Sequence, residues 1–268
     1  MNIKNNRSFF LGAGFSVEAG IPLTAELLTK AMKKFEEECP GIFWRVSNYA
    51  RECTLTPETE DVDYAKVDFS ELCTFLEFIE LREYGGGERW KDSGSKEKLN
   101  LRYYLAKTII EAMPNLDDIP SIYMDFVNEL HEGDIVVTFN WDPLLEVALK
   151  AVGKNYCYNY EDPSAIKLCK LHGSVNWRLG ELHEYQTSPV DLGWESFKFT
   201  EGILDTEMYF SERLIEHSVW TAGERNSQVE PFLVLPGYGK AFDVRSNAVL
   251  WYKPEFIFGF THDVYIIG

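Results

Sequence analysis

Two glycines one residue apart follow a short apolar run near the start of the chain. The run is "FFL", residues 9–11, and the glycines are Gly12 and Gly14. Such glycines let backbone N–H groups approach a pyrophosphate, and the end of a following helix favours negative charge. Ser16 could add a hydroxyl hydrogen bond. A full dinucleotide fingerprint would have a third glycine where the chain has Val17, so this loop alone is as typical of a structural turn as of a phosphate site.

The segment "TFNWDP", residues 138–143, offers an amide and a carboxylate after a second apolar run. In open parallel sheets, ligands bind beyond the carboxyl ends of the strands. Asn140 can donate and accept hydrogen bonds there. Asn140 could equally stabilise a loop, and Asp142, followed by Pro143, has the position of a helix N-cap. A capping carboxylate is held in place by its helix, so it could also face a ligand.

Two further segments end apolar runs with side chains that can do chemistry. In "KLHGSVNW", residues 170–177, His172 could act as a general base because imidazoles titrate near neutral pH. The alternative is a structural histidine. In "LVLPGYGK", residues 233–240, Lys240 could neutralise a phosphate and Tyr238 could stack on a ring. The alternative there is a plain proline–glycine turn.

Short apolar runs alternate with stretches of helical periodicity along the chain. We expect strands at 7–11, 134–139, 166–171, 231–236 and 263–268. We expect helices from Pro22 to about 38, over 68–84, 99–113 and 121–131, after an Asp142 N-cap with Pro143 as the first helical residue, and near 205–219. Residues 39–66 show few periodic signals and are predicted to be irregular, and the glycine-rich stretch 85–98 is predicted to be an exposed loop.

This alternation predicts an α/β fold. We expect a Rossmann-like, mostly parallel sheet with helices on both faces and a large helical insertion after the first strand and helix. A single domain would span 1–268, with a core of about 1–38, 132–175 and 231–268 and an insertion of about 39–131. Because an apolar strand reaches the last residue, we expect the native chain to continue beyond 268.

Composition narrows the class of protein. Acidic residues outnumber basic ones, 43 to 26, for a formal net charge of -17, which argues against direct binding of nucleic acid or an anionic membrane. The five cysteines form no C-x-x-C pair, so a zinc ribbon is not expected. No signal peptide and no apolar run long enough to cross a bilayer is present. We therefore expect a cytoplasmic protein with reduced cysteines.

Three segments occur together in one order: "GAGFSVEAGIP", "TFNWD" and "KLHGS". This series resembles the sirtuin superfamily, in which corresponding segments surround one NAD pocket. Two departures matter. Sirtuin deacylases follow Ile-Pro with Asp-Phe-Arg, whereas this chain has Leu23, Thr24 and Ala25, and they carry two C-x-x-C pairs for a structural zinc, which this chain lacks. The chain therefore resembles the divergent sirtuin-like domains of bacterial anti-phage proteins, which hydrolyse NAD.

The resemblance implies an NAD+ hydrolase that releases nicotinamide and ADP-ribose and acts in prokaryotic defence by depleting NAD. It implies catalytic roles for Asn140, which would orient the ribose or the attacking water, and for His172, which would bind a ribose hydroxyl or act as base. Asp142 would bind the nicotinamide carboxamide. The remaining nucleotide-binding residues would be Gly12, Ala13, Gly14, Ser16, Gly20, Ile21, Pro22, Gly173, Tyr238 and Lys240.

The same resemblance bears on cofactors and partners. NAD would be the substrate, and no metal is implied. We expect a homo-oligomer, together with a C-terminal sensor domain or a partner protein that triggers activity. Two alternatives remain open: a sirtuin-type protein deacylase or ADP-ribosyltransferase, and a domain that binds NAD or ADP-ribose as a sensor without turnover.

Overall fold

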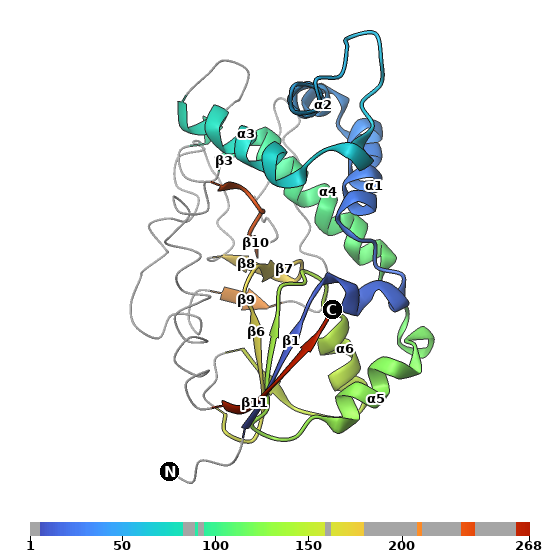
Figure 1. Cartoon of the computed structure of the whole chain (residues 1–268), viewed down its shortest axis with the longest axis vertical. Helices are drawn as coiled ribbons and strands as arrows, with labels where there is room; N and C mark the ends of the chain where they lie inside the picture. The colour runs from blue at the N-terminus through green and yellow to red at the C-terminus, as the bar shows by residue number, and fades with distance from the viewer. Residues whose placement is uncertain are drawn as a thin grey trace, which may run out of the picture.

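A five-stranded parallel sheet forms the centre of the molecule, in the order β11-β1-β4-β6-β5 (Figure 1). Its strands are β1 (Asn6–Leu11), β4 (Ile135–Thr138), β5 (Tyr156–Cys157), β6 (Ile166–Lys170) and β11 (Thr261–Ile267). The computed structural model describes residues 6–82, 89–90, 94–158, 162–179, 208–210, 232–238 and 261–268. The predicted α/β fold with a mostly parallel, Rossmann-like sheet is confirmed.

The register of the three middle strands brings their carboxyl ends to one level. Leu11 at the end of β1 lies opposite Thr138 of β4, and Thr138 lies opposite Lys170 of β6. All four residues of β4 are buried, as expected for a β-branched run covered on both faces of a parallel sheet. The loops that follow the three strands therefore start side by side.

Two helices cover one face of this sheet. They are α5 (Ser121–Glu129) and α6 (Leu144–Ala151). Phe9 and Leu11 of β1 share a buried core with Val127 of α5 and Leu145 of α6. The opposite face of the sheet buries a smaller cluster, Ile135, Val137, Cys169 and Leu171.

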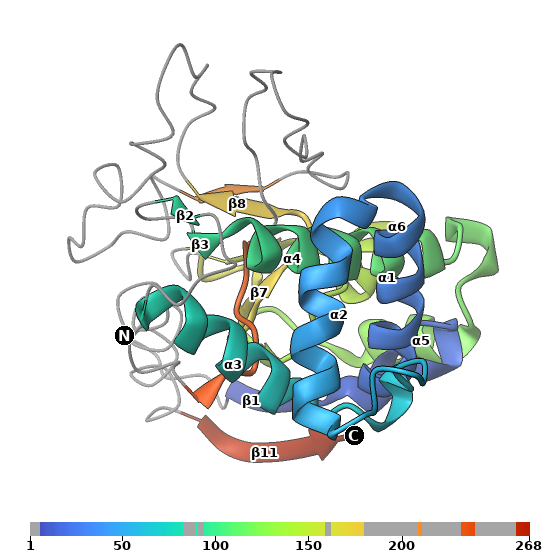
Figure 2. The ribbon, with the colours of Figure 1, turned by 90° about the horizontal axis from the view of Figure 1, so that it is seen from above.

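Four more helices lie beyond the carboxyl ends of the strands and share a second buried core. They are α1 (Thr24–Glu38), α2 (Pro40–Thr54), α3 (Phe69–Arg82) and α4 (Lys96–Ala112). Figure 2 shows these four helices lying over the strands. Short 3-10 turns, η1 (Ala13–Ala19), η2 (Tyr64–Lys66) and η3 (Leu116–Asp118), connect the elements.

The packing divides the chain differently from the predicted core and insertion. Helix α5 falls within residues 39–131 but packs on the sheet, whereas α1 falls outside that range and packs with α2–α4. The idea that residues 39–131 form an insertion therefore stays a prediction.

Two expectations for irregular segments are wrong. Residues 39–66 were expected to be irregular, yet α2 begins with Pro40 in its first turn, where the missing N–H does no harm. The stretch 85–98 was expected to be a loop, yet β2 (Arg89–Trp90) and β3 (Gly94–Ser95) pair antiparallel and α4 begins at Lys96.

Two expectations for regular segments also need correction. The strand expected at 231–236 is only β10 (Phe232–Leu233), which pairs antiparallel with β7 (Gly173–Ser174) outside the parallel sheet. Within the range 205–219, where a helix was expected, residues Met208–Phe210 form the strand β9, which pairs with β8 (Trp177–Leu179). The rest of that expected helix lies outside the described residues. Pairing with a distant segment overrides local periodicity in both places.

No helix in the described part of the chain is both long and apolar enough to cross a membrane.

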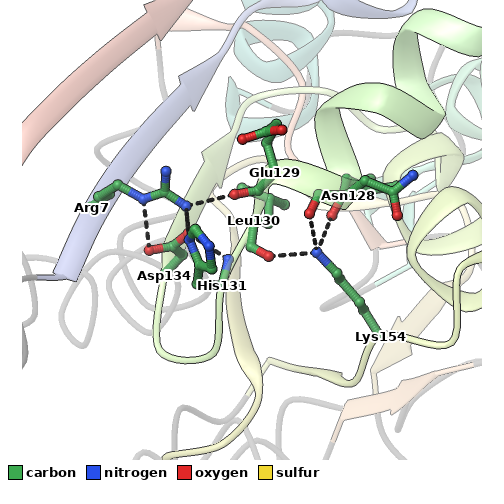
Figure 3. A network of polar contacts seen from close by, with 8 residues as sticks. Arg7, Asn128, Glu129, Leu130, His131, Asp134 and Lys154 are labelled. Atoms are coloured by element: carbon green, nitrogen blue, oxygen red, sulfur yellow. Dashed lines mark hydrogen bonds and ion pairs between the residues drawn. The ribbon is translucent and has the colours of Figure 1, made fainter.

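Polar contacts at the amino ends of the strands tie the last turn of α5 to the sheet (Figure 3). Lys154 donates to the backbone carbonyls of Val127, Asn128 and Leu130, at Nζ–O distances of 2.7, 2.6 and 2.5 Å. These carbonyls belong to the end of α5, where the helix itself leaves acceptors unsatisfied and a cation is favoured. Arg7 of β1 donates to the next carbonyl group in this region, that of Glu129.

We expect Lys154→Met to lower the free energy of unfolding by about 1–3 kcal/mol, because it leaves three backbone carbonyl oxygens without their charged hydrogen-bond donor. Lys33→Met is the matched control, since Lys33 is exposed on α1, and it should change stability by less than about 0.5 kcal/mol. Urea unfolding followed by circular dichroism measures both. Equal stability of the two variants would show that the Lys154 contacts contribute nothing.

Candidate active site

A cavity of about 490 Å³ lies between the carboxyl ends of β1, β4 and β6 and the helices α1, α3 and α4. Its volume is within the range usual for small-molecule sites. The polar side chains of Ser16, Asn140, Asp142 and His172 line it from the sheet side. The register of the strands thus brings the three sequence segments singled out for their chemistry into one cavity.

A chain of buried hydrogen bonds links three of these side chains. Ser16 Oγ donates to Asp142 Oδ2 at 2.9 Å, and Asn140 Nδ2 donates to Ser16 Oγ at 3.0 Å. An ionised carboxylate only accepts, so the single Ser16 proton goes to Asp142 and the Ser16 oxygen accepts from the Asn140 amide. This polarity leaves Asn140 Oδ1 as an acceptor with no donor to it among the described residues, and Asn140 lines the cavity.

Asp142 also caps the start of helix α6. Its Oδ1 accepts from the backbone N–H of Leu144 at 3.2 Å. The prediction that Asp142 is the N-cap and Pro143 the first helical residue is wrong by one position, because α6 begins at Leu144 and Pro143 occupies the N-cap. The capping hydrogen bond from Asp142 nevertheless forms and holds its carboxylate at the cavity.

The environment of Asp142 sets its charge. Burial raises the pKa of the Asp142 carboxyl above its ordinary value of 3.8. The Lys170 ammonium and the hydrogen bond from Ser16 oppose that rise, and the Glu146 carboxylate adds to it. Lys170 donates to Glu146 Oε1 at 2.8 Å and to the Asp142 carbonyl at 2.7 Å.

Trp141 joins the loop after β4 to the loop after β6. Its Nε1 donates to the His172 carbonyl at 3.0 Å, and its own carbonyl accepts from Ser174 Oγ at 3.1 Å and from the Val175 N–H at 3.0 Å. Gly173 has φ of +75°, a backbone conformation that favours glycine. These contacts hold His172 at the edge of the cavity, beside Asn140 in the wall.

His172 is half-buried, and its ring meets the ring of Phe139 edge-on, with the centroids 5.2 Å apart. Both side chains line the cavity. A partly exposed imidazole in this position can accept a hydrogen bond or a proton from a molecule in the cavity.

The two glycines of the opening segment lie against Ile267 and Gly268 and do not line the cavity. The Gly12 N–H donates to the Ile267 carbonyl of β11 at 2.9 Å. A Cβ atom on Gly14 would lie 2.7 Å from the carbonyl carbon of Gly268, so glycine there allows Gly268, the residue after β11, to approach. Neither Gly12 nor Gly14 lines the cavity. The loop reaches it instead through other residues of the same segment, which are Ala13, Ser16, Ile21 and Pro22.

Two further predicted site residues, Gly20 and Tyr238, do not line the cavity. Gly20 ends η1 with φ of +83°. Tyr238 is 78% exposed, and its backbone N–H donates to Thr74 Oγ1 of α3 at 2.7 Å. Pro236 of the same segment does line the cavity. Lys240 lies outside the described residues.

Sequence reasoning missed the residues that α3 contributes. Asp68, Phe69 and Ser70 line the cavity from the helical side. Asp68 accepts from the backbone N–H of Glu71 at 3.0 Å, as a residue before a helix commonly does. That capping pattern is visible in the sequence, but no local signal shows that this helix start faces the sheet.

Within the described ranges, no group of three or more His, Cys, Asp or Glu side chains is arranged to hold a metal ion.

The Ser16 hydroxyl should contribute to stability, whereas the Asp142 charge should not. Ser16→Ala leaves Asp142 Oδ2 and Asn140 Nδ2 buried without their partner, so we expect the free energy of unfolding to fall by about 1–3 kcal/mol. Ser121→Ala, at an exposed serine of α5, is the control. Asp142→Asn keeps an acceptor for Leu144 and should not lower stability at pH 7.

The pH dependence has a definite sign. Unfolded Asp142 loses its proton near pH 3.8, but folded Asp142 holds it to higher pH. The stability contributed by Asp142 therefore falls as pH rises through that window. In thermal melts from pH 4 to 7, Asp142→Asn should gain stability relative to the wild type as pH rises. A constant or shrinking difference would contradict this account.

Comparison with known proteins gives no indication of the function. No protein-family model matches the chain, and no curated protein matches it significantly. The case for a function therefore depends on the arrangement of Ser16, Asn140, Asp142 and His172 in the cavity.

Proposed function

We propose that this chain is an NAD+ glycohydrolase, which cleaves NAD+ to nicotinamide and ADP-ribose. The single observation that carries the proposal is the hydrogen-bond chain Asp142–Ser16–Asn140 on the wall of a cavity that also holds His172. The resemblance to sirtuin-like domains adds the substrate and the role, which is NAD depletion as an effector of prokaryotic anti-phage defence.

In this reaction the bond between the ribose carbon and the nicotinamide nitrogen breaks, and its electron pair stays on the nicotinamide. The ribose carbon develops positive charge and is attacked by water, whose proton must go to a base. Asn140 Oδ1, left open as an acceptor by the Ser16 hydrogen bond, would orient the water or a ribose hydroxyl. His172 would bind a ribose hydroxyl or take the proton.

The charges around the cavity suit the cationic nicotinamide end of NAD+. The positively charged pyridinium of NAD+ would face the carboxylates of Asp142 and Asp68, and no lysine or arginine lines the cavity in the described part of the chain. Trp141 and Phe139 supply aromatic surface for a flat ring. Asp142 would also accept a hydrogen bond from the nicotinamide carboxamide.

Purified protein incubated with NAD+ should release nicotinamide and ADP-ribose in equal amounts, measured by liquid chromatography. Asn140→Ala and His172→Ala should each lower kcat/KM by about a hundredfold or more. Asn128→Ala and His131→Ala are the matched controls, because both residues are exposed at the opposite end of the sheet (Figure 3), and they should keep the wild-type rate.

Four results would point elsewhere. No release of nicotinamide would contradict the hydrolase, and NAD binding without release would favour a sensor. Release only in the presence of an acetylated peptide would favour a deacylase. Wild-type rates in both the Asn140 and the His172 variant would refute the assignment of the site.

A further inference from the structure

Lys170 is a charged side chain in a place where an apolar one would be expected. It ends β6, and its side chain is 0% exposed. Lysine is almost never fully buried unless it is paired, because removing an ammonium from water is unfavourable. Here the ammonium binds two groups, Glu146 Oε1 and the Asp142 carbonyl. An apolar pair of similar volume would fill the same space at no loss of stability, so the charges require another reason.

We propose that Lys170 and Glu146 are positioning residues for the reaction. Lys170 holds the backbone at Asp142 and favours the ionised form of its carboxylate. The Glu146 carboxylate opposes that form of Asp142 and so limits the effect of Lys170. This inference rests on the proposed function, since the carboxylate in question belongs to the NAD site. Neither residue lines the cavity, so both act through Asp142.

Ionisable side chains around Asp142 come from several elements of the fold. Lys170 lies on β6, Glu146 on α6 and Tyr123 on α5, and Asp68 and His172 line the same cavity. Lys170 is the positive charge among the groups that act on Asp142, and its influence exceeds that of Glu146.

Glu146 is itself held in the interior. The hydroxyl of Tyr158 donates to its Oε1 at 2.9 Å, and its Oε2 is buried with no hydrogen-bond partner among the described residues. The carboxylate therefore depends on Lys170 and Tyr158 for compensation. If all three groups are ionised, Asp142, Glu146 and Lys170 carry one net negative charge next to a cavity that we propose to hold the cationic pyridinium end of NAD+.

The charge of Asp142 controls the direction of the hydrogen bonds that reach Asn140. An ionised Asp142 takes the Ser16 proton, so Asn140 donates to Ser16 and offers Oδ1 to the substrate. A protonated Asp142 can donate to Ser16 instead, and Ser16 can then donate to Asn140 Oδ1 once the Asn140 amide turns over, since its Nδ2 faces Ser16 in the structure. That reversal would occupy the acceptor on which the reaction depends, so cleavage should fail at pH values where Asp142 is protonated.

Two variants should therefore shift the acid limb of the kcat/KM profile in opposite directions. Lys170→Met removes the favourable charge and should move the limb to higher pH by about 1 unit. Glu146→Gln removes the opposing carboxylate and should move it to lower pH. Lys33→Met, on α1, is the control and should leave the profile unchanged. A merely structural role would lower activity without moving the limb, and superimposable profiles would equally overturn the inference.

A double variant protects the test against misfolding. Lys170→Met with Glu146→Gln removes both buried charges, which proteins often tolerate. Because the influence of Lys170 is the larger, its acid limb should still lie above that of the wild type but below that of Lys170→Met. A limb at or below the wild-type position would refute the proposed balance of charges.

Titration of Asp142 by carbon NMR, assigned from the signal lost in Asp142→Asn, separates this inference from the proposed function. The order of midpoints should be Glu146→Gln, wild type, double variant, Lys170→Met, from low to high pH, whether or not NAD is cleaved. If the four proteins show this order of midpoints but the wild type cleaves no NAD, only the proposed hydrolase activity is refuted. Equal midpoints refute the role of the buried pair.

Discussion

Three parallel strands end at one level, and the candidate site depends on that register. Leu11, Thr138 and Lys170 lie opposite one another across β1, β4 and β6. A shift of one residue in a strand would turn its side chains to the other face of the sheet and would move Asn140 away from Ser16. The hydrogen bonds between the loops, from Ser16 to Asp142 and from Trp141 to His172, can form because the strands deliver the loops side by side.

The site is also a place where polar and charged groups are buried without an evident gain in folding stability. Asp142 and Lys170 are buried charges, and a sheet end of this kind would be as stable with apolar residues. Their retention is understandable if a polar wall with a fixed hydrogen-bond direction is needed to act on a substrate. Residues at or beside the starts of α1 and α3, and Ile109 of α4, complete the cavity.

The parts of the fold that the sequence predicts well have strong local causes. The β-branched run of β4 and the Asp-Pro start of α6 identify those elements to within a residue or two. Helix α2 was not predicted, because only Val46 and Ala50 are fully buried and its apolar periodicity is therefore weak. The run "FLVL" was assigned to the main sheet because an apolar run does not reveal its neighbours, and Leu233 and Leu235 instead pack with α1–α4.

The same distinction applies to the site. Ser16, Asn140, Asp142 and His172 were found from their positions after apolar runs, and the structure brings them to one cavity. The residues that the start of α3 adds to the cavity and the contacts of Lys170 were not predictable, because both depend on contacts between distant segments. Gly12 and Gly14 suggested direct phosphate contact, which stays a prediction, and the structure places both against Ile267 and Gly268 and neither in the lining of the cavity.

The most direct test is a crystal structure with a carbocyclic analogue of NAD+, in which a methylene group replaces the oxygen of the nicotinamide ribose ring and prevents cleavage. The account predicts that the nicotinamide and its sugar lie in the cavity, with a sugar hydroxyl or a bound water about 3 Å from Asn140 Oδ1 and the sugar beside His172. An analogue bound outside the cavity, or with its adenine end against Asn140, would contradict it.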